Sequence, residues 1–412
     1  MALGRALRHR NYRLFFTGQG VSLVGTWLTK FAIAWMAYKL TGSAFMLGLV
    51  AFTSNAPTSL FAPLAGVLVD RWNRQRVILV TQVLAGVQSA ALAVFAFADA
   101  MTVWHLMVLG AFQGVINAFD MPARQSFLRE MIDDPADLPN AIALNSAVVN
   151  VAKLSGPVFA AVLVGLVGEA WCFAIDATTY IAVVASLVAI RVKPGPARER
   201  GSVLVQLRAG FRYVRDTPIL RDVLVQLAVN SVLAGAYLQL LPAVAAEQVG
   251  HGPYTLGILM ASGGFGALAG TLYLASRTAV DGLRVVVLQS RLVLGAAMMM
   301  LVFATTTWLA APIVFVMGAA LMIQLAGTNT IIQTVGDPAM LGRVMSMYAI
   351  ANSGGVPVGA FIEGSIAEYA GAANTLAGAG LLVVLVTLVF RRNTSMTVPP
   401  QATIARRSSM AA

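Results

Sequence analysis

Long apolar runs separated by short polar stretches dominate the chain. Runs of membrane-spanning length cover residues 14–38, 45–69, 77–98, 102–122, 139–166, 170–190, 219–246, 254–276, 284–304, 308–333, 340–367 and 371–390. A helix of about 20 apolar residues crosses the hydrocarbon core of a bilayer, and only helices or closed barrels satisfy their backbone polar groups in lipid. The pattern therefore predicts an all-α integral membrane protein with twelve transmembrane helices.

Composition agrees with this interpretation and narrows the class of protein. The chain has 412 residues, of which 58% are hydrophobic and 11% are charged, whereas a soluble globular protein is about one quarter charged. The single cysteine, Cys172, excludes an intramolecular disulfide. The sequence contains no phosphate-binding Gly-Lys-Ser/Thr loop, catalytic triad or metal-ligand spacing. We therefore expect no enzyme activity, no cofactor and no bound metal.

The 28 lysines and arginines indicate orientation rather than nucleic-acid binding. They punctuate the apolar runs instead of gathering on one polar domain, and only Lys39 falls in a loop on the side opposite the arginine-rich loops. Cytoplasmic loops of membrane proteins are enriched in lysine and arginine. Both termini are therefore predicted to be cytoplasmic. The first apolar run is too long for a cleavable signal peptide.

The longest connection, 191–218, divides the chain into two halves. It is rich in arginine, and it carries an apolar stripe at helical spacing: Leu204, Leu207, Phe211 and Val214. This pattern predicts a short basic amphipathic helix, which lies either on the inner membrane surface or against the cytoplasmic face of the helices. The predicted organisation is a six-helix bundle in 1–190, a linker in 191–218, a second six-helix bundle in 219–392 and a disordered tail in 393–412.

The two halves carry traces of a repeat. A constant offset of 203 residues, the difference between Asp134 and Asp337, aligns Arg74 with Arg277, Pro135 with Pro338 and Gly156 with Gly359. Two parallel six-helix repeats with substrate bound between them form a transporter architecture. The predicted fold is therefore two pseudo-repeat bundles.

The stretch GVLVDRWNRQRV (66–77) interrupts the apolar runs with a dense group of charges. It resembles the loop signature of the major facilitator superfamily, although Asn73 replaces the usual glycine and Gln75 replaces a basic residue. The resemblance implies a conformational latch, in which the aspartate meets the N-terminus of helix 11 and a basic residue of the loop pairs with an acid at the end of helix 4. The candidate latch residues are Gly66, Asp70, Arg71, Arg74, Asp120 and Arg124. The simpler alternative is a positive-inside marker, which does not explain Gly66 or Asp70.

Four further stretches narrow the resemblance to one subgroup. Residues 10–27, 119–132, 138–157 and 342–368 resemble the major facilitator subgroup of enterobactin exporters and macrolide-efflux pumps. The resemblance implies a monomeric secondary transporter of the bacterial inner membrane that exports an amphipathic small molecule, such as a drug or siderophore, in exchange for protons. The alternatives are a facilitator or symporter of a metabolite or lipid-like molecule, and a non-transporting receptor or scaffold.

Helix 5 resembles the antiporter helix of the superfamily. Gly156 and Pro157 match that motif, and its other glycine positions are all alanine here. Small residues let helices approach closely in lipid, and proline bends them. Gly156 and Pro157 are therefore candidates for a helix-5 hinge, with generic tight packing as the alternative.

Arg291 falls inside a predicted membrane helix, and so do four charged residues that we single out: Lys30, Lys153, Asp176 and Glu363. Ionisable groups in lipid are costly and often functional, so we consider all four as candidates for proton coupling. Structural ion pairing and snorkelling to water are the alternatives.

Polar uncharged residues mark a candidate substrate cavity on the helices that line it in this superfamily. They are Gln19, Thr26, Asn55, Gln113, Asn117, Asn230, Gln239, Gln324 and Asn329. Apolar walls with few polar anchors suit an amphipathic substrate.

Overall fold

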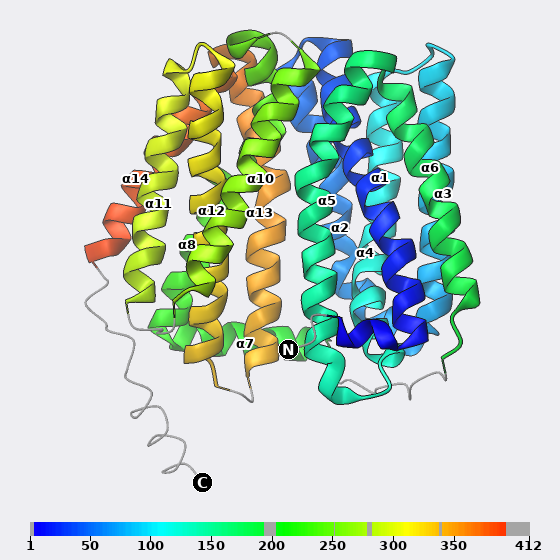
Figure 1. Cartoon of the computed structure of the whole chain (residues 1–412). Coiled ribbons are helices and arrows are strands. Elements are labelled where there is room, and N and C mark those ends of the chain that lie inside the picture. The colour runs from blue at the N-terminus through cyan, green and yellow to red at the C-terminus, as the bar shows by residue number, and fades with distance from the viewer. Residues whose placement is uncertain (1–3, 193–202, 251, 278–281, 338–339, 393–412) are drawn as a thin grey trace, which may run out of the picture.

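The computed structural model describes residues 4–192, 203–250, 252–277, 282–337 and 340–392. Twelve membrane-spanning segments follow one another in two bundles (Figure 1), which confirms the predicted all-α fold. Within the described residues, eleven segments are long and apolar enough to cross a membrane. The twelfth, α13 (Leu341–Ala370), has 30 residues, and glycine, serine and two glutamates interrupt its apolar residues.

The N-terminal bundle begins with the short helix η1 (Arg5–Arg8) and contains six long helices. These are α1 (Arg10–Thr41), α2 (Ala44–Arg71), α3 (Arg74–Phe97), α4 (Val103–Phe127), α5 (Leu138–Val167) and α6 (Glu169–Ala189). Two short helices, η2 (Leu128–Met131) and η3 (Pro135–Asp137), connect α4 to α5.

The C-terminal bundle contains the other six spans. They are α8 (Pro218–Leu233) with α9 (Tyr237–Val244) and the π-turn η4 (Ala245–Val249), α10 (Pro253–Ala275), α11 (Leu283–Met300) with η5 (Leu301–Phe303), α12 (Thr307–Val335), α13 and α14 (Ala372–Arg392). The run predicted at 219–246 is thus one span but not one helix. Its break lies at Gly235, where an added Cβ would overlap Val356 of α13.

Helix α7 (Val203–Asp216) lies between the bundles in sequence and across one end of the molecule in space (Figure 1). It packs against α8 and α13, with Val214 buried and Phe211 exposed. The side chains of Leu204 and Leu207, the rest of the linker before α7, and the tail from 393 lie outside the described residues. We call the end of the molecule that carries the N-terminus and α7 the α7 face, and the other end the distal face.

The apolar core is continuous near the distal face and divided near the α7 face. One cluster joins residues of both bundles, such as Phe31 and Leu259. Toward the α7 face, a cluster around Phe127 belongs to the N-terminal bundle alone, and a cluster around Ile332 belongs to the C-terminal bundle alone. The two bundles therefore share a core only in their distal half.

Candidate functional site

Two helix pairs close the distal half of the molecule between the bundles. Helix α2 packs on α13, and α5 packs on α10. A Cβ atom added to Gly48 of α2 would overlap the carbonyl of Ala360, and one added to Gly257 of α10 would overlap the Cβ of Ala161. Glycine lets these backbones approach closely, which gives dispersion contacts in place of a hydrophobic driving force.

Polar contacts reinforce this closure at the distal face. The Glu368 carboxylate of α13 accepts hydrogen bonds from Ser43 Oγ (2.8 Å) and Phe45 N (2.9 Å) at the N-terminus of α2. The hydroxyl of Tyr38 donates to Glu247 Oε1 (2.8 Å) and thus also joins the two bundles. We call Tyr38, Ser43, Glu247 and Glu368 the distal gate. The sequence pattern did not identify these residues, because they lie at helix ends where a polar side chain is ordinary.

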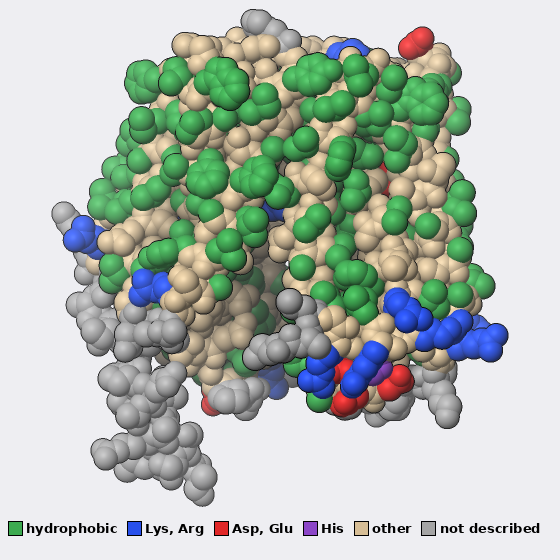
Figure 2. Space-filling view, in the orientation of Figure 1, with side chains coloured by type: hydrophobic (Ala, Val, Ile, Leu, Met, Phe, Trp, Pro, Cys, Tyr) green, Lys and Arg blue, Asp and Glu red, His purple; other side chains and the backbone are tan. Residues whose placement is uncertain are grey.

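The molecule is hollowed between the bundles toward the α7 face. Figure 2 shows this hollow, with a Lys or Arg side chain inside it. A hydrogen bond from Ser59 Oγ of α2 to Ser353 O of α13 (3.0 Å) joins the bundles near the middle of both helices. Closer to the α7 face, an added Cβ on Gly66 of α2 meets nothing within 4 Å. The bundles are thus closed distally and apart near α7.

The latch candidates make contacts different from those expected. Arg74 pairs with Glu130 of η2, not with Asp120. Asp120 is buried within α4, seven residues before its end, and pairs with Arg124 while accepting hydrogen bonds from Thr81 Oγ1 (2.8 Å) and Gln82 Nε2 (2.9 Å). These contacts stay inside the N-terminal bundle, because η2 rather than the last turn of α4 presents an acid to Arg74.

The remaining latch residues lie at the α7 end of α2. Arg71 is exposed in the last turn of α2, and the side chain of Asp70 lies outside the described part of the structure. Helix α13 begins at Leu341 after Met340, and residues 338–339 before them also lie outside the described part. The latch stays a prediction.

Gly156 of α5 lies against Trp27 of α1. A Cβ on Gly156 would overlap the Cβ of Trp27, so only glycine allows this approach. Pro157 lies inside α5, next to the α10 contact at Gly257. The hinge role of Gly156 and Pro157 stays a prediction, and their packing role is direct.

Lys30 and Lys153 lie around one aromatic ring. The Lys30 Nζ is 4.6 Å and the Lys153 Nζ is 6.0 Å from the centroid of the Trp27 ring. Lys30 is exposed and Lys153 is half-buried, although both lie well inside membrane-spanning helices. Neither ammonium forms an ion pair or hydrogen bond with another residue that the structure describes.

Asp176 lies at the interface of α1, α3 and α6. It is 1% exposed, and its Oδ2 accepts hydrogen bonds from Thr29 Oγ1 (2.9 Å) and Ser89 Oγ (2.7 Å). Gly25 of α1 lies against the other oxygen, Oδ1, which has no hydrogen-bond partner in the described structure. The carboxyl is thus fixed by two hydroxyls and balanced by no direct ion pair.

Glu363 is the buried carboxyl of the C-terminal bundle. It is 4% exposed on α13, and both of its oxygens lack a hydrogen-bond partner among the described residues. Burying a carboxylate without a partner is costly. Lys153, Lys30, Asp176 and Glu363 therefore separate into two cations beside Trp27 and two carboxyls inside the bundles.

The polar cavity candidates also separate into groups. Gln19, Asn230 and Gln324 are buried and keep side-chain atoms without a partner in the described structure. Others form hydrogen bonds within one helix: Thr26 donates to Ser22, Asn55 to Ala51, Gln113 to Asn117 and Gln333 to Asn329. Thr26 also contacts Tyr180, and Asn329 contacts Tyr348, on neighbouring helices. Gln239 is half-buried on α9. No contact identifies any of them as a substrate ligand.

A buried arginine in the C-terminal bundle adds to the charges inside the membrane. Arg291 of α11 is 2% exposed and donates to Gln226 of α8 and to Thr328 of α12 (3.5 Å). Among the described residues it has no acidic partner. Its position inside a predicted helix was evident from the sequence, but its amide and hydroxyl partners depend on how three helices rotate.

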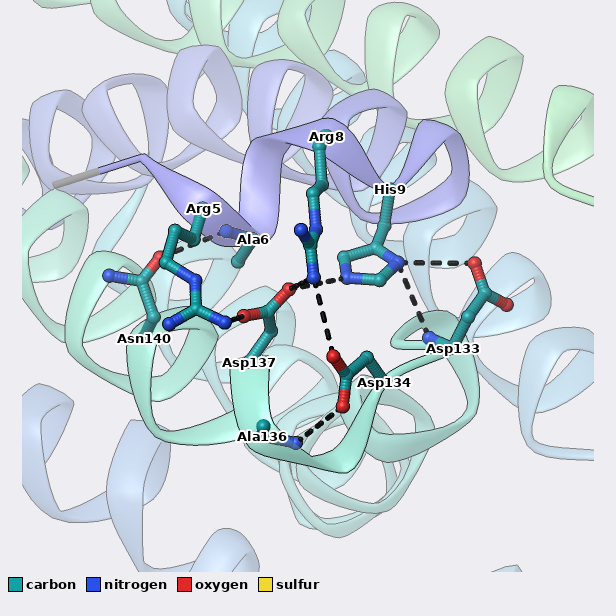
Figure 3. A network of polar contacts seen from close by, with 9 residues as sticks. All are labelled: Arg5, Ala6, Arg8, His9, Asp133, Asp134, Ala136, Asp137 and Asn140. Atoms are coloured by element: carbon teal, nitrogen blue, oxygen red, sulfur yellow. Dashed lines mark hydrogen bonds and ion pairs between the residues drawn. The ribbon is translucent and has the colours of Figure 1, made fainter. Parts of the chain in front are cut away.

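A dense ionic network fixes the N-terminus to the α4–α5 connection at the α7 face (Figure 3). Asp137, buried at the start of α5, accepts from His9 Nε2 (3.0 Å) and pairs with Arg5 (2.9 Å) and Arg8 (2.7 Å). The other His9 ring nitrogen, Nδ1, contacts Asp133 (3.1 Å). Helix η1 is thus held by one carboxylate with three basic partners.

Titration of this network follows from its contacts. Burial opposes the charged form of His9, but hydrogen bonds and charges of Asp133 and Asp137 outweigh burial and raise the His9 pKa above its ordinary value. The hydrogen bond from His9 outweighs burial and, with the charges of Arg5 and Arg8, lowers the pKa of Asp137. Both shifts favour the charged pair.

Among the described residues, no group of three or more His, Cys, Asp or Glu side chains is placed to hold a metal ion. The arrangement offers a hollow between two bundles, two lysines beside Trp27 and two buried carboxyls. A hollow of this kind suits the binding of a small molecule.

Comparisons with known proteins agree with this geometry. The sequence pattern of the transmembrane secretion effector family matches residues 5–410. The multidrug efflux pump Tap of Mycolicibacterium fortuitum is 26% identical over 89% of this chain and 91% of its own. The enterobactin exporter EntS of Escherichia coli O1:K1 / APEC is 25% identical over 96% of this chain and 95% of its own. A bacterial homolog of the human lysosomal transporter Spinster, solved in an inward-facing, occupied conformation, superposes with a TM-score of 0.71 at 16% identity, covering 92% of this chain and 95% of its own.

Proposed function

The chain belongs to the transmembrane secretion effector family of major facilitator transporters, and we propose that it exports an amphipathic small molecule from the bacterial cytoplasm in exchange for protons. It is a membrane transporter and not an enzyme, with distant similarity to drug and siderophore exporters. The direction of transport, the coupling ion and the substrate class are the proposed elements.

One observation carries the direction: the hollow opens toward the face where basic side chains gather. Figure 2 shows Lys and Arg side chains concentrated at this end of the molecule. By the positive-inside rule that end is cytoplasmic. Both termini then lie in the cytoplasm of a bacterial inner-membrane protein, and the hollow is loaded from inside the cell.

Coupling to protons is supported by the two buried carboxyls. Asp176 keeps one oxygen and Glu363 keeps both oxygens without a partner in the described structure. A carboxyl that lies in each bundle can lose or gain a proton as water reaches it in one conformation and is excluded in the other. In this cycle, substrate loading from the cytoplasm favours proton release, and protonation from outside favours substrate release.

Transport into inverted membrane vesicles tests the proposal. Vesicles with an acidic lumen should accumulate at least one of three fluorescent amphipaths: ethidium, N-phenyl-1-naphthylamine or 8-anilinonaphthalene-1-sulfonate. Collapse of the pH gradient with nigericin should release the accumulated dye. Accumulation equal to that of vesicles without the protein would overturn the proposal of export. Accumulation that survives nigericin would indicate a facilitator or a different coupling ion.

A further inference from the structure

We propose that Lys30 and Lys153 form the anion-binding part of the substrate site, so that the transported molecule is an amphipathic anion. This inference rests on the proposed function and names its substrate class. It depends on the geometry around Trp27, on the charge balance of that region and on the position of the two lysines relative to the hollow.

The two ammonium groups converge from different helices. Lys30 is on α1 and Lys153 is on α5, yet both lie near the Trp27 ring, at 4.6 and 6.0 Å from its centroid. Cations are attracted to the face of an indole ring. The Trp27 ring is itself fixed, because its Cβ packs directly on Gly156. The protein thus holds two like charges together with an aromatic ring rather than with a carboxylate.

The local charge is positive. Both ammonium groups lie near the Trp27 ring, and Asp176 is a buried acid on the neighbouring helix α6. Asp176 forms its hydrogen bonds with Thr29 and Ser89, not with either lysine. Two ammonium groups therefore face one carboxyl that is held elsewhere. An acidic group placed between the lysines would balance this charge with charge-assisted hydrogen bonds, which are about twice as strong as neutral ones.

Lys153 lies beside a contact between α5 of one bundle and α10 of the other. Leu154, the residue after Lys153, contacts Gly264 of α10, and from there to Tyr254 and Gly165 the two helices stay in close contact toward the distal face. Lys153 thus lies next to a contact between the two bundles. Lys30 has an exposed side chain, although it is 11 residues, or about 17 Å at 1.5 Å per residue, from the end of α1 at Thr41.

The size of the hollow favours an amphipathic anion over a small inorganic anion. The hollow separates two bundles along about half of their length, as the divided cores on the α7 side indicate. A small inorganic anion would contact only the lysines. A molecule with one acidic group and an apolar body would place the acid on Lys30 and Lys153 and the body in the rest of the hollow, since small-molecule sites combine apolar surface with a few polar groups.

Binding of two matched dyes tests the inference. N-phenyl-1-naphthylamine and 8-anilinonaphthalene-1-sulfonate share one skeleton and differ by the sulfonate. Equilibrium dialysis against protein in phosphatidylcholine nanodiscs, corrected with empty nanodiscs, should show that Lys30→Gln and Lys153→Gln each weaken sulfonate binding about tenfold, a loss of about 1.4 kcal/mol, and leave naphthylamine binding unchanged. Lys39→Gln is the matched control on α1, since Lys39 pairs with Glu169 at the distal end.

Three outcomes separate the possibilities. Equal sulfonate binding by wild type, Lys30→Gln and Lys153→Gln would overturn the anion site. Vesicles that accumulate ethidium or the naphthylamine but not the sulfonate would also overturn it, while the proposed export function would stand. If anionic phosphatidylglycerol in the nanodisc competes with the sulfonate in the wild type and not in the lysine variants, the lysines bind an anion whose source is a lipid headgroup.

Discussion

At the residue scale, a glycine determines how closely α1 and α5 pack, because it has no side chain beyond a hydrogen atom. Gly156 lets the Trp27 side chain lie on the α5 backbone, and Trp27 in turn lies beside the two lysines. The small residue that the sequence marks as an antiporter-like position thus also supports the candidate anion site.

Gly156→Ala is predicted to lower transport strongly while the protein still inserts into the membrane. The added methyl overlaps Trp27 Cβ, and overpacking of this kind costs about 1–3 kcal/mol, so the melting temperature should also fall. Gly378→Ala on α14 is the control, because a Cβ there meets nothing within 4 Å. Wild-type transport and melting temperature in Gly156→Ala would show that the α1–α5 contact is loose.

At the element scale, one charged group of α13 contacts the N-terminus of α2. Glu368 of α13 accepts from Ser43 and Phe45 at the N-terminus of α2. The predicted latch is the reciprocal arrangement, with Asp70 of α2 at the N-terminus of α13 when the α7 face closes. Acidic groups at a helix N-terminus gain about 0.3–1 kcal/mol at exposed sites.

Substitutions of Glu368 at the distal face and Asp70 at the α7 face are predicted to shift the equilibrium between the two conformations, open and closed at the α7 face, in opposite directions. Glu368→Gln should reduce the population open at the α7 face by roughly two- to fivefold, the ratio that corresponds to about 0.3–1 kcal/mol. Asp70→Asn should increase that population and slow transport without lowering the melting temperature. The measurement is the labelling rate of a cysteine at position 66 in a Cys172→Ser background. Changes of the same sign in both variants would contradict reciprocal capping.

The N-terminal helix η1 is predicted to dock in a pH-dependent way. Because the His9 pKa is raised by folding, its contribution to stability is complete below the ordinary histidine value of about 6.5 and is lost as pH rises through the raised pKa. Asp137, with its lowered pKa, contributes above its ordinary value and loses this contribution as pH falls through the lowered pKa. The melting temperature should therefore fall as pH rises from about 6.5 through the raised His9 pKa.

His9→Gln should flatten that pH dependence. His105→Gln is the matched control, because His105 contacts Thr102 and Phe95 rather than carboxylates. An equal slope in wild type and His9→Gln would place the pH-sensitive group elsewhere.

At the scale of the whole molecule, the sequence predicts the bounds of the membrane-spanning helices far better than the contacts that their polar side chains make. The apolar run 139–166 predicts α5 at Leu138–Val167 because lipid sets the length of a helix directly. The partners of Asp176 and Arg74 depend on helix rotation and on the short helix η2, for which hydrophobic periodicity gives no signal. The break at Gly235 was missed for the same reason, since both parts of that span are apolar.

The division of the apolar core into one shared and two separate clusters is also visible only in the whole molecule. One apolar cluster spans both bundles distally, and separate clusters lie on the α7 side of each bundle. Alternating access then requires the distal contacts to separate as the α7 side closes. The buried carboxyls Asp176 and Glu363 are the groups through which protons are proposed to bias this exchange.

Proton flux driven by substrate tests this central claim most directly. The protein is reconstituted into liposomes in weakly buffered medium, the dye that inverted vesicles accumulate most is added outside, and external pH is recorded with an electrode. We predict external acidification with the wild type, and its loss in Asp176→Asn or Glu363→Gln while gradient-free dye counterflow continues. Dye entry into wild-type liposomes without any proton movement would contradict proton-coupled export.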